Sequence, residues 1–139
     1  MARIPKLFLE TTIFNFYFDG KQGQKHKDTL ALFDEIKKGS YNPFTSGAVI
    51  EELRKSKKEK FDTMFSLTVD YKISILIPDQ SAIDLANKYI KSGLIPLNYP
   101  DDARHIAVAT VESIDFLLSW NMEHIVKQKT MIGHRIYSY

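Results

Sequence analysis

Short runs rich in apolar residues recur along the chain, separated by longer stretches in which apolar residues lie three or four positions apart. Runs of about four or five residues have the length of buried strands, whereas the longer stretches have the period of helices. The run at residues 116–119 does not alternate between apolar and polar side chains, which is typical of a parallel strand covered on both faces. We therefore predict strands at residues 6–10, 41–45, 73–77 and 116–119, and a closing strand at 135–138.

The stretches between these strands predict the helices. At residues 26–38, the apolar side chains of Leu30, Phe33 and Ile36 share one helical face and should point inward. Thr12 precedes an apolar segment and belongs to a residue type that caps helices. Helices are predicted at residues 13–18, 26–38, 47–55, 59–71, 81–91, 102–112 and 122–127.

The alternation of strands and helices predicts an α/β fold with three layers, α/β/α, and a central parallel sheet of four to five strands. The chain has 139 residues, enough for one domain with a sizeable core, and it shows no internal repeat or linker. We expect one domain over residues 1–139. Ligands of such folds bind at the carboxyl ends of the strands.

Composition narrows the function classes only a little. Apolar residues make up 44% and charged residues 26%, with a net charge of +2, which permits nucleic-acid binding without requiring it. The chain contains no cysteine, which excludes disulfides and thiolate metal sites and fits a cytoplasmic protein. The apolar run near the N-terminus is too short for a signal peptide or a membrane span, so no membrane association is expected.

Acidic and amide side chains occur where strands end and helices begin. Glu10 ends the first predicted strand, Asp102 opens a helix, and Asn121 follows the strand at 116–119. On the helix at 47–55, Glu52 lies beside the buried stripe, whereas Glu51 should face solvent. Carboxylates gathered at one sheet edge repel one another, and a divalent cation relieves that repulsion.

Each of these residues also has a purely structural interpretation. Glu10 can be a solvated or capping carboxylate, Asp102 can cap its helix, and Asn121 can turn the chain. Their joint placement favours a cation site. Ligands that are all oxygen atoms suit Mg²⁺ or Mn²⁺ better than zinc, and such ions commonly bind phosphate oxygens and activate water.

At these residues the chain resembles the PIN-domain proteins, in particular the VapC-like ribonuclease toxins of toxin–antitoxin systems. The resemblance is carried by residues 9–13, 45–53 and 102–109, and by 117–121 with His124. It implies a parallel sheet flanked by helices, a Mg²⁺ (or Mn²⁺) cofactor and endoribonuclease activity on RNA. It also implies an antitoxin protein as partner and a homodimer.

The resemblance assigns Glu10, Glu52, Asp102 and Asn121 as the catalytic and metal-binding residues. Most PIN nucleases have aspartate where this chain has Glu10, and aspartate again where it has Asn121. A branch of the family with a Glu-Thr start and a Trp-Asn pair shares both features.

Further residues near this edge could support the site. Thr11 and Ser46 could hydrogen-bond a ligand or a bound water, and Arg104 could bind phosphate, although capping and surface roles are at least as common. The basic segment at 54–60 could guide an RNA backbone or simply be solvated. The aromatic segment at 14–18 favours packing or partner binding over base stacking.

These observations favour a metal-dependent endoribonuclease that hydrolyses RNA phosphodiester bonds, the toxin of a toxin–antitoxin pair. The alternative is a catalytically weak or inactive PIN-like module that binds RNA or a protein partner. A nuclease acting on structured DNA is a third hypothesis, because no feature of the sequence reads the 2′-hydroxyl.

Overall fold

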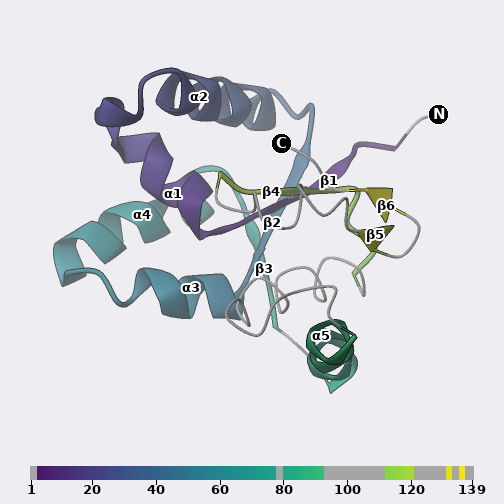
Figure 1. Cartoon of the computed structure of the whole chain (residues 1–139). Coiled ribbons are helices and arrows are strands. Elements are labelled where there is room, and N and C mark those ends of the chain that lie inside the picture. Colours follow the sequence, from purple (N-terminus) through teal and green to yellow (C-terminus); the bar gives the residue numbers. More distant parts are fainter. Residues whose placement is uncertain (1–2, 78–79, 93–111, 121–130, 133–134, 137–139) are drawn as a thin grey trace.

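The computed structural model describes residues 3–77, 80–92, 112–120, 131–132 and 135–136. Within these ranges, helices and strands alternate along the chain, as the apolar pattern predicts (Figure 1). The elements are β1 (Lys6–Leu9), α1 (Thr11–Phe18), the short 3₁₀ helix η1 (Gly20–Gln22), α2 (Gln24–Lys37), β2 (Asn42–Ser46), α3 (Gly47–Leu53), α4 (Lys58–Asp70), β3 (Ser74–Leu76), α5 (Gln80–Lys91), β4 (Phe116–Leu118), β5 (Met131–Ile132) and β6 (Arg135–Ile136).

Four of the strands form one parallel sheet in the order β3-β2-β1-β4. The chain moves from β1 to β2 and β3 in one direction and then returns to place β4 on the other side of β1. The carboxyl ends of β1 and β4 therefore form the switch point of the sheet, where α/β folds bind their ligands. The predicted parallel sheet is confirmed, with four strands.

Helices cover both faces of this sheet. Right-handed connections place α1 to α4 on one face and α5, which precedes the return to β4, on the other. The contacts of α1 with α2, α3 and α4 agree with this arrangement, and Figure 1 shows α5 apart from the other four helices. The predicted α/β/α layers are confirmed.

The central strand carries the core. Leu7, Phe8 and Leu9 are buried at successive positions, so side chains on both faces of β1 are covered. Phe14 on α1 and Phe33 on α2 are also buried, which fixes these two helices against the sheet. The apolar character of β1 therefore sets the position of the residue that follows it, Glu10.

Helix α1 is anchored at its far end by an aromatic cluster. The hydroxyl groups of Tyr17 and Tyr71 lie 2.9 Å apart, and both rings pack edge-on against Phe33. The hydrogen bond with Tyr17, aided by burial, raises the pKa of Tyr71 to about 12. The aromatic residues of α1 thus pack largely within the molecule, although Phe18 remains 45% exposed.

Several boundaries and one strand pairing differ from the predictions. Helix α2 begins at Gln24, two residues earlier than predicted, and Leu30 on its predicted inner face is 36% exposed. The predicted closing strand is a two-residue strand, β6, which pairs antiparallel with β5 instead of extending the central sheet. The helix predicted at 122–127 lies outside the described residues, as does that at 102–112 except for a turn at Glu112.

Among the residues that the structure describes, none of the helices has the length and apolar character needed to cross a membrane.

The burial pattern of α2 gives a direct test of the fold. We expect Phe33→Ala to lower the free energy of unfolding by about 3–5 kcal/mol, because it opens a cavity in the core. Leu30→Ala on the same helix should change it by less than about 1 kcal/mol, because that side chain is partly in solvent. Urea denaturation of both variants measures the difference, and equal losses would contradict the assigned helix face.

Candidate functional site

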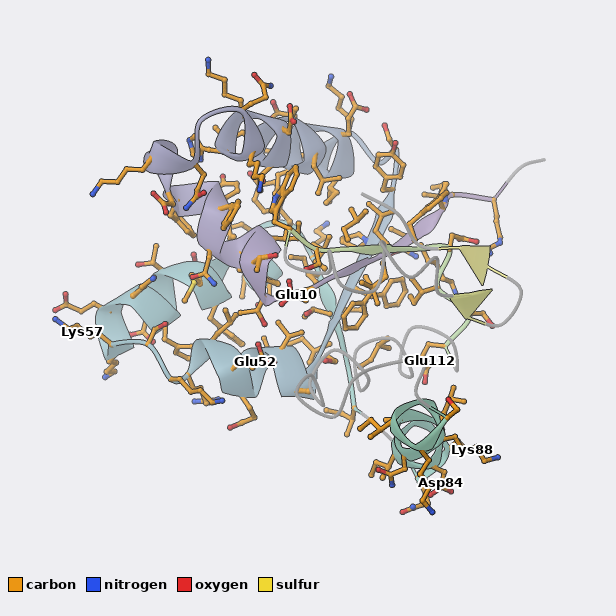
Figure 2. The ribbon with its side chains drawn as sticks, viewed as in Figure 1. Glu10, Glu52, Lys57, Asp84, Lys88 and Glu112 are labelled. Atoms are coloured by element: carbon orange, nitrogen blue, oxygen red, sulfur yellow. The ribbon has the colours of Figure 1, made fainter. Side chains whose placement is uncertain are left out.

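The carboxylate of Glu10 lies at the switch point of the sheet, directly after β1 (Figure 2). The residue is only 5% exposed. Its Oε1 atom accepts three hydrogen bonds: from the backbone N–H of Thr12 at 3.0 Å, from the Thr12 hydroxyl at 2.7 Å and from the Ser119 hydroxyl at 2.6 Å. Glu10 is thereby the N-cap of α1. The prediction that Thr12 would cap this helix is wrong, because the chain already turns into the helix at Thr11.

The hydroxyl of Thr12 links two strands and a helix. It donates to Glu10 and accepts from the backbone N–H of Trp120 at 2.8 Å. The strands pair in register here, since Leu9 faces Leu118 and the Glu10 N–H donates to the Leu118 carbonyl at 3.1 Å. The end of β1, the start of α1 and the end of β4 are therefore joined at one carboxylate.

Glu52 reaches the same region from α3. The hydroxyl of Thr11 donates to its Oε2 atom at 2.6 Å, and Thr11 directly follows Glu10. Glu51 instead is exposed and pairs with Arg54 at 3.4 Å. Of the two adjacent carboxylates, Glu52 is the one that faces the start of α1, as its position in the helical repeat predicts.

Two buried hydroxyls fix α3 and β2 beside Glu10. Ser46 accepts from the backbone N–H of Val49 at 3.3 Å and so caps α3. Thr45 donates to the Leu9 carbonyl at 2.8 Å. Both residues are fully buried. Ser46 therefore has the capping role that was one of its two sequence interpretations, and it orients the helix that carries Glu52.

Sequence reasoning missed Ser119 and Thr45. Both lie at strand ends beside β1, so they contact Glu10 or its neighbour only because β2 and β4 flank β1 in the sheet. A polar residue ending an apolar strand was the available signal. That signal does not say which strand lies next to which.

The structure thus brings together Glu10, Thr11 and Glu52. The other predicted site residues, Asp102, Asn121 and Arg104, lie outside the described residues. Over the described ranges alone, no group of three or more acidic, histidine or cysteine side chains has the arrangement of a metal site. Two of the four predicted ligands are therefore placed, and both are carboxylates.

The donor chemistry of this pair fits a hard divalent cation. The available ligand atoms are carboxylate oxygens, and the chain has no cysteine to favour a softer metal. The three hydrogen bonds to Glu10 all reach Oε1, and no hydrogen bond from a described residue reaches Oε2. Within the part of the chain that the structure describes, Glu10 is thus held through Oε1.

The basic segment begins just past Glu52. Arg54, Lys55, Lys57, Lys58 and Lys60 are exposed around the turn between α3 and α4, where Figure 2 labels Lys57. The Arg54 guanidinium lies over the Phe61 ring, 4.8 Å from its centroid. The positive charges are available to solvent near the end of α3 that points away from the sheet.

Comparisons with known proteins support the fold. No family model matches the chain, and no curated protein matches it. A solved structure of VapBC2 from Rickettsia felis, bound to a DNA fragment from their promoter, contains a chain that matches with a TM-score of 0.64. The two chains are 19% identical, and the match covers 96% of this chain and 97% of that one. The fold is accordingly the PIN-like three-layer fold.

The linking role of Thr12 can be measured without any ligand. Thr12→Val leaves the Trp120 N–H without its acceptor and removes one donor from Glu10, so unfolding free energy should fall by about 1–3 kcal/mol. Thr12→Ser keeps the hydroxyl and should stay within about 1 kcal/mol of the native protein. Urea unfolding followed by fluorescence of Trp120, the single tryptophan, reports both values. A Thr12→Val protein as stable as Thr12→Ser would contradict the assigned link.

Proposed function

We propose that the protein is a metal-dependent endoribonuclease that hydrolyses RNA phosphodiester bonds. The observation that carries this proposal is the hydrogen bond from Thr11, the residue after Glu10, to Glu52, which brings the second carboxylate to the switch point of the sheet. Two carboxylates brought to one region at the switch point are suited to share a cation, because the positive charge relieves their mutual repulsion.

In this proposal Glu10 and Glu52 hold Mg²⁺ (or Mn²⁺), and Asp102 and Asn121 complete the ligand set. The bound cation supplies charge neutralisation on the scissile phosphate and lowers the pKa of a coordinated water. Asn121 provides a neutral oxygen, so the set carries three negative charges when all carboxylates are ionised. Glu10 also has one methylene more than aspartate, which its three hydrogen bonds to Oε1 restrain.

The surrounding hydroxyls act as positioning residues. The Thr11 hydroxyl orients Glu52, while the hydroxyls of Thr12 and Ser119 orient Glu10. Hydrogen-bond partners of metal ligands commonly set ligand geometry and tune metal affinity. The exposed basic segment after α3 attracts the polyanionic backbone of the substrate without selecting its sequence.

The proposal includes an antitoxin partner. Its support is the shared fold with a chain of VapBC2, together with the sequence resemblance to VapC-like toxins. A nuclease of this kind acts on cellular RNA in the cytoplasm and is held inactive by the antitoxin until released. Homodimerisation belongs to the same expectation.

Cleavage of a mixed-sequence RNA by the purified protein tests the proposal. We expect cleavage with Mg²⁺ or Mn²⁺ and none with EDTA. Glu52→Gln and Asp102→Asn should each lower the cleavage rate by more than about 100-fold, since loss of even a hydrogen-bond partner of a metal ligand costs about 10–100-fold. Glu51→Gln is the matched control, because Glu51 is the exposed neighbour of Glu52.

Three outcomes would count against the proposal. Equal cleavage by Glu52→Gln and Glu51→Gln would reject Glu52 as a ligand. RNA binding without turnover would instead indicate a catalytically inactive binding module. Faster cleavage of a matched DNA would reassign the substrate.

A further inference from the structure

A cavity of about 220 Å³ opens beside Glu10, between α1, α2 and the end of β4. Its apolar wall is formed by Ile13, Leu32 and Leu118. Ser119 and Trp120 complete it on the β4 side. We call this cavity the Trp120 pocket. It is smaller than the sites of about 300–1,000 Å³ that hold drug-sized ligands, so it suits a single ring system.

The pocket and the carboxylate site share Ser119. The hydroxyl of this residue donates to Glu10 Oε1 at 2.6 Å, while the residue itself lines the cavity. A group seated in the pocket is therefore separated from the Glu10 carboxylate by one small side chain. A strand whose backbone lies at Glu10 could place a neighbouring base there.

The indole of Trp120 is held in place before any ligand binds. Its Nε1–H donates to the Thr29 hydroxyl at 3.0 Å, and that hydroxyl donates in turn to the Lys25 carbonyl at 2.7 Å. Phe16 stacks nearly parallel to the indole at a centroid distance of 6.1 Å. Because the indole N–H is already paired, the ring offers the pocket a fixed aromatic surface and no donor of its own.

Two charged side chains of α2 border this aromatic surface. The Lys25 ammonium lies 5.7 Å from the centroid of the Trp120 ring, and the exposed Asp28 lines the pocket. A nucleotide carries an aromatic base with N–H donors and a phosphate with negative charge. Asp28 can accept from the base edge, and Lys25 can neutralise the phosphate.

We propose that the Trp120 pocket binds one unpaired nucleobase of the RNA strand, next to the phosphodiester held at Glu10 and Glu52. This inference rests on the proposed ribonuclease function and adds a substrate subsite to it. Aromatic surfaces bind bases with little sequence preference. Asp28 is the only carboxylate among the residues that line the pocket, and its Oδ1 atom accepts from the Gln24 side-chain amide at 2.8 Å, which leaves Oδ2 as the candidate acceptor for a base. An apolar side chain of a partner protein could fill the cavity, but it would interact with neither the Lys25 ammonium nor the Asp28 carboxylate.

Tryptophan fluorescence comes from Trp120 alone, and Trp120 lines the pocket. We would titrate the purified protein with nucleoside 5′-monophosphates and with a short single-stranded RNA in EDTA, so that no cleavage occurs. We expect a saturable change in fluorescence with both probes. Ribose 5-phosphate, which has the sugar and phosphate but no base, should give none.

Matched variants on α2 separate the pocket from the rest of the surface. Leu32→Phe fills the cavity and should weaken the response to the monophosphates by about tenfold. Leu30→Phe makes the same substitution at a partly exposed position outside the pocket and should leave it unchanged. Should Leu32→Phe fail to fold, the exposed pair Asp28→Ala and Asp34→Ala makes the same comparison, with weakening expected only for Asp28→Ala.

Several results would overturn the proposal. One is an RNA that binds in an anisotropy assay without changing Trp120 fluorescence, and another is the absence of any RNA binding. A third is an equal fluorescence response of the two variants in each matched pair. A response to N-acetylphenylalaninamide but not to nucleotides would reassign the pocket to a protein side chain. The titration needs no metal and no turnover, so it tests the pocket separately from the nuclease activity. A base-dependent fluorescence response from a protein that cleaves no RNA would support the nucleobase pocket and reject the ribonuclease function. RNA cleavage without a change in Trp120 fluorescence would support the ribonuclease function and reject the nucleobase pocket.

Discussion

The arrangement of the whole site depends on one oxygen atom, Oε1 of Glu10. It accepts hydrogen bonds from Thr12, twice, and from Ser119, and the Thr12 hydroxyl also accepts from the Trp120 backbone. A buried carboxylate requires such partners, because leaving it unpaired in the interior would be costly. Satisfying this requirement joins β1, α1 and β4 at the switch point of the sheet and fixes the direction in which each element leaves it.

The same constraint lets one residue both cap a helix and belong to the proposed cation site. Glu10 caps α1 with one oxygen, and its other oxygen receives no hydrogen bond from the described residues. Thr11, the next residue, holds Glu52 on α3. Ser119 supports Glu10 on one side and lines the Trp120 pocket on the other. A carboxylate pair and an aromatic cavity are thus adjacent because they share the side chains at the ends of two neighbouring strands.

The sequence was most informative where the spacing of apolar residues determines the type of element and the direction in which a side chain points. The apolar runs predict all four strands of the sheet, and helical spacing predicts that Glu52, not Glu51, faces inward. The prediction that Leu30 points inward is wrong, because the side chain is 36% exposed. Helical spacing shows which residues of α2 share a face, but it does not show how far the core extends across that face. The contacts of Ser119 and Thr45 could not be predicted, because they depend on the spatial order of strands far apart in sequence. Half of the predicted ligand set, Asp102 and Asn121, lies outside the described residues and remains a prediction.

In the proposed function, Glu10 and Glu52 share a divalent cation at the switch point of the sheet. The most direct measurement is anomalous diffraction from crystals of the protein grown with Mn²⁺. We expect an anomalous peak in contact with Oε2 of Glu10 and within reach of the Glu52 carboxylate, directly or through a coordinated water. Well-ordered carboxylates with no peak between them at saturating Mn²⁺, or a peak held by other residues, would contradict it.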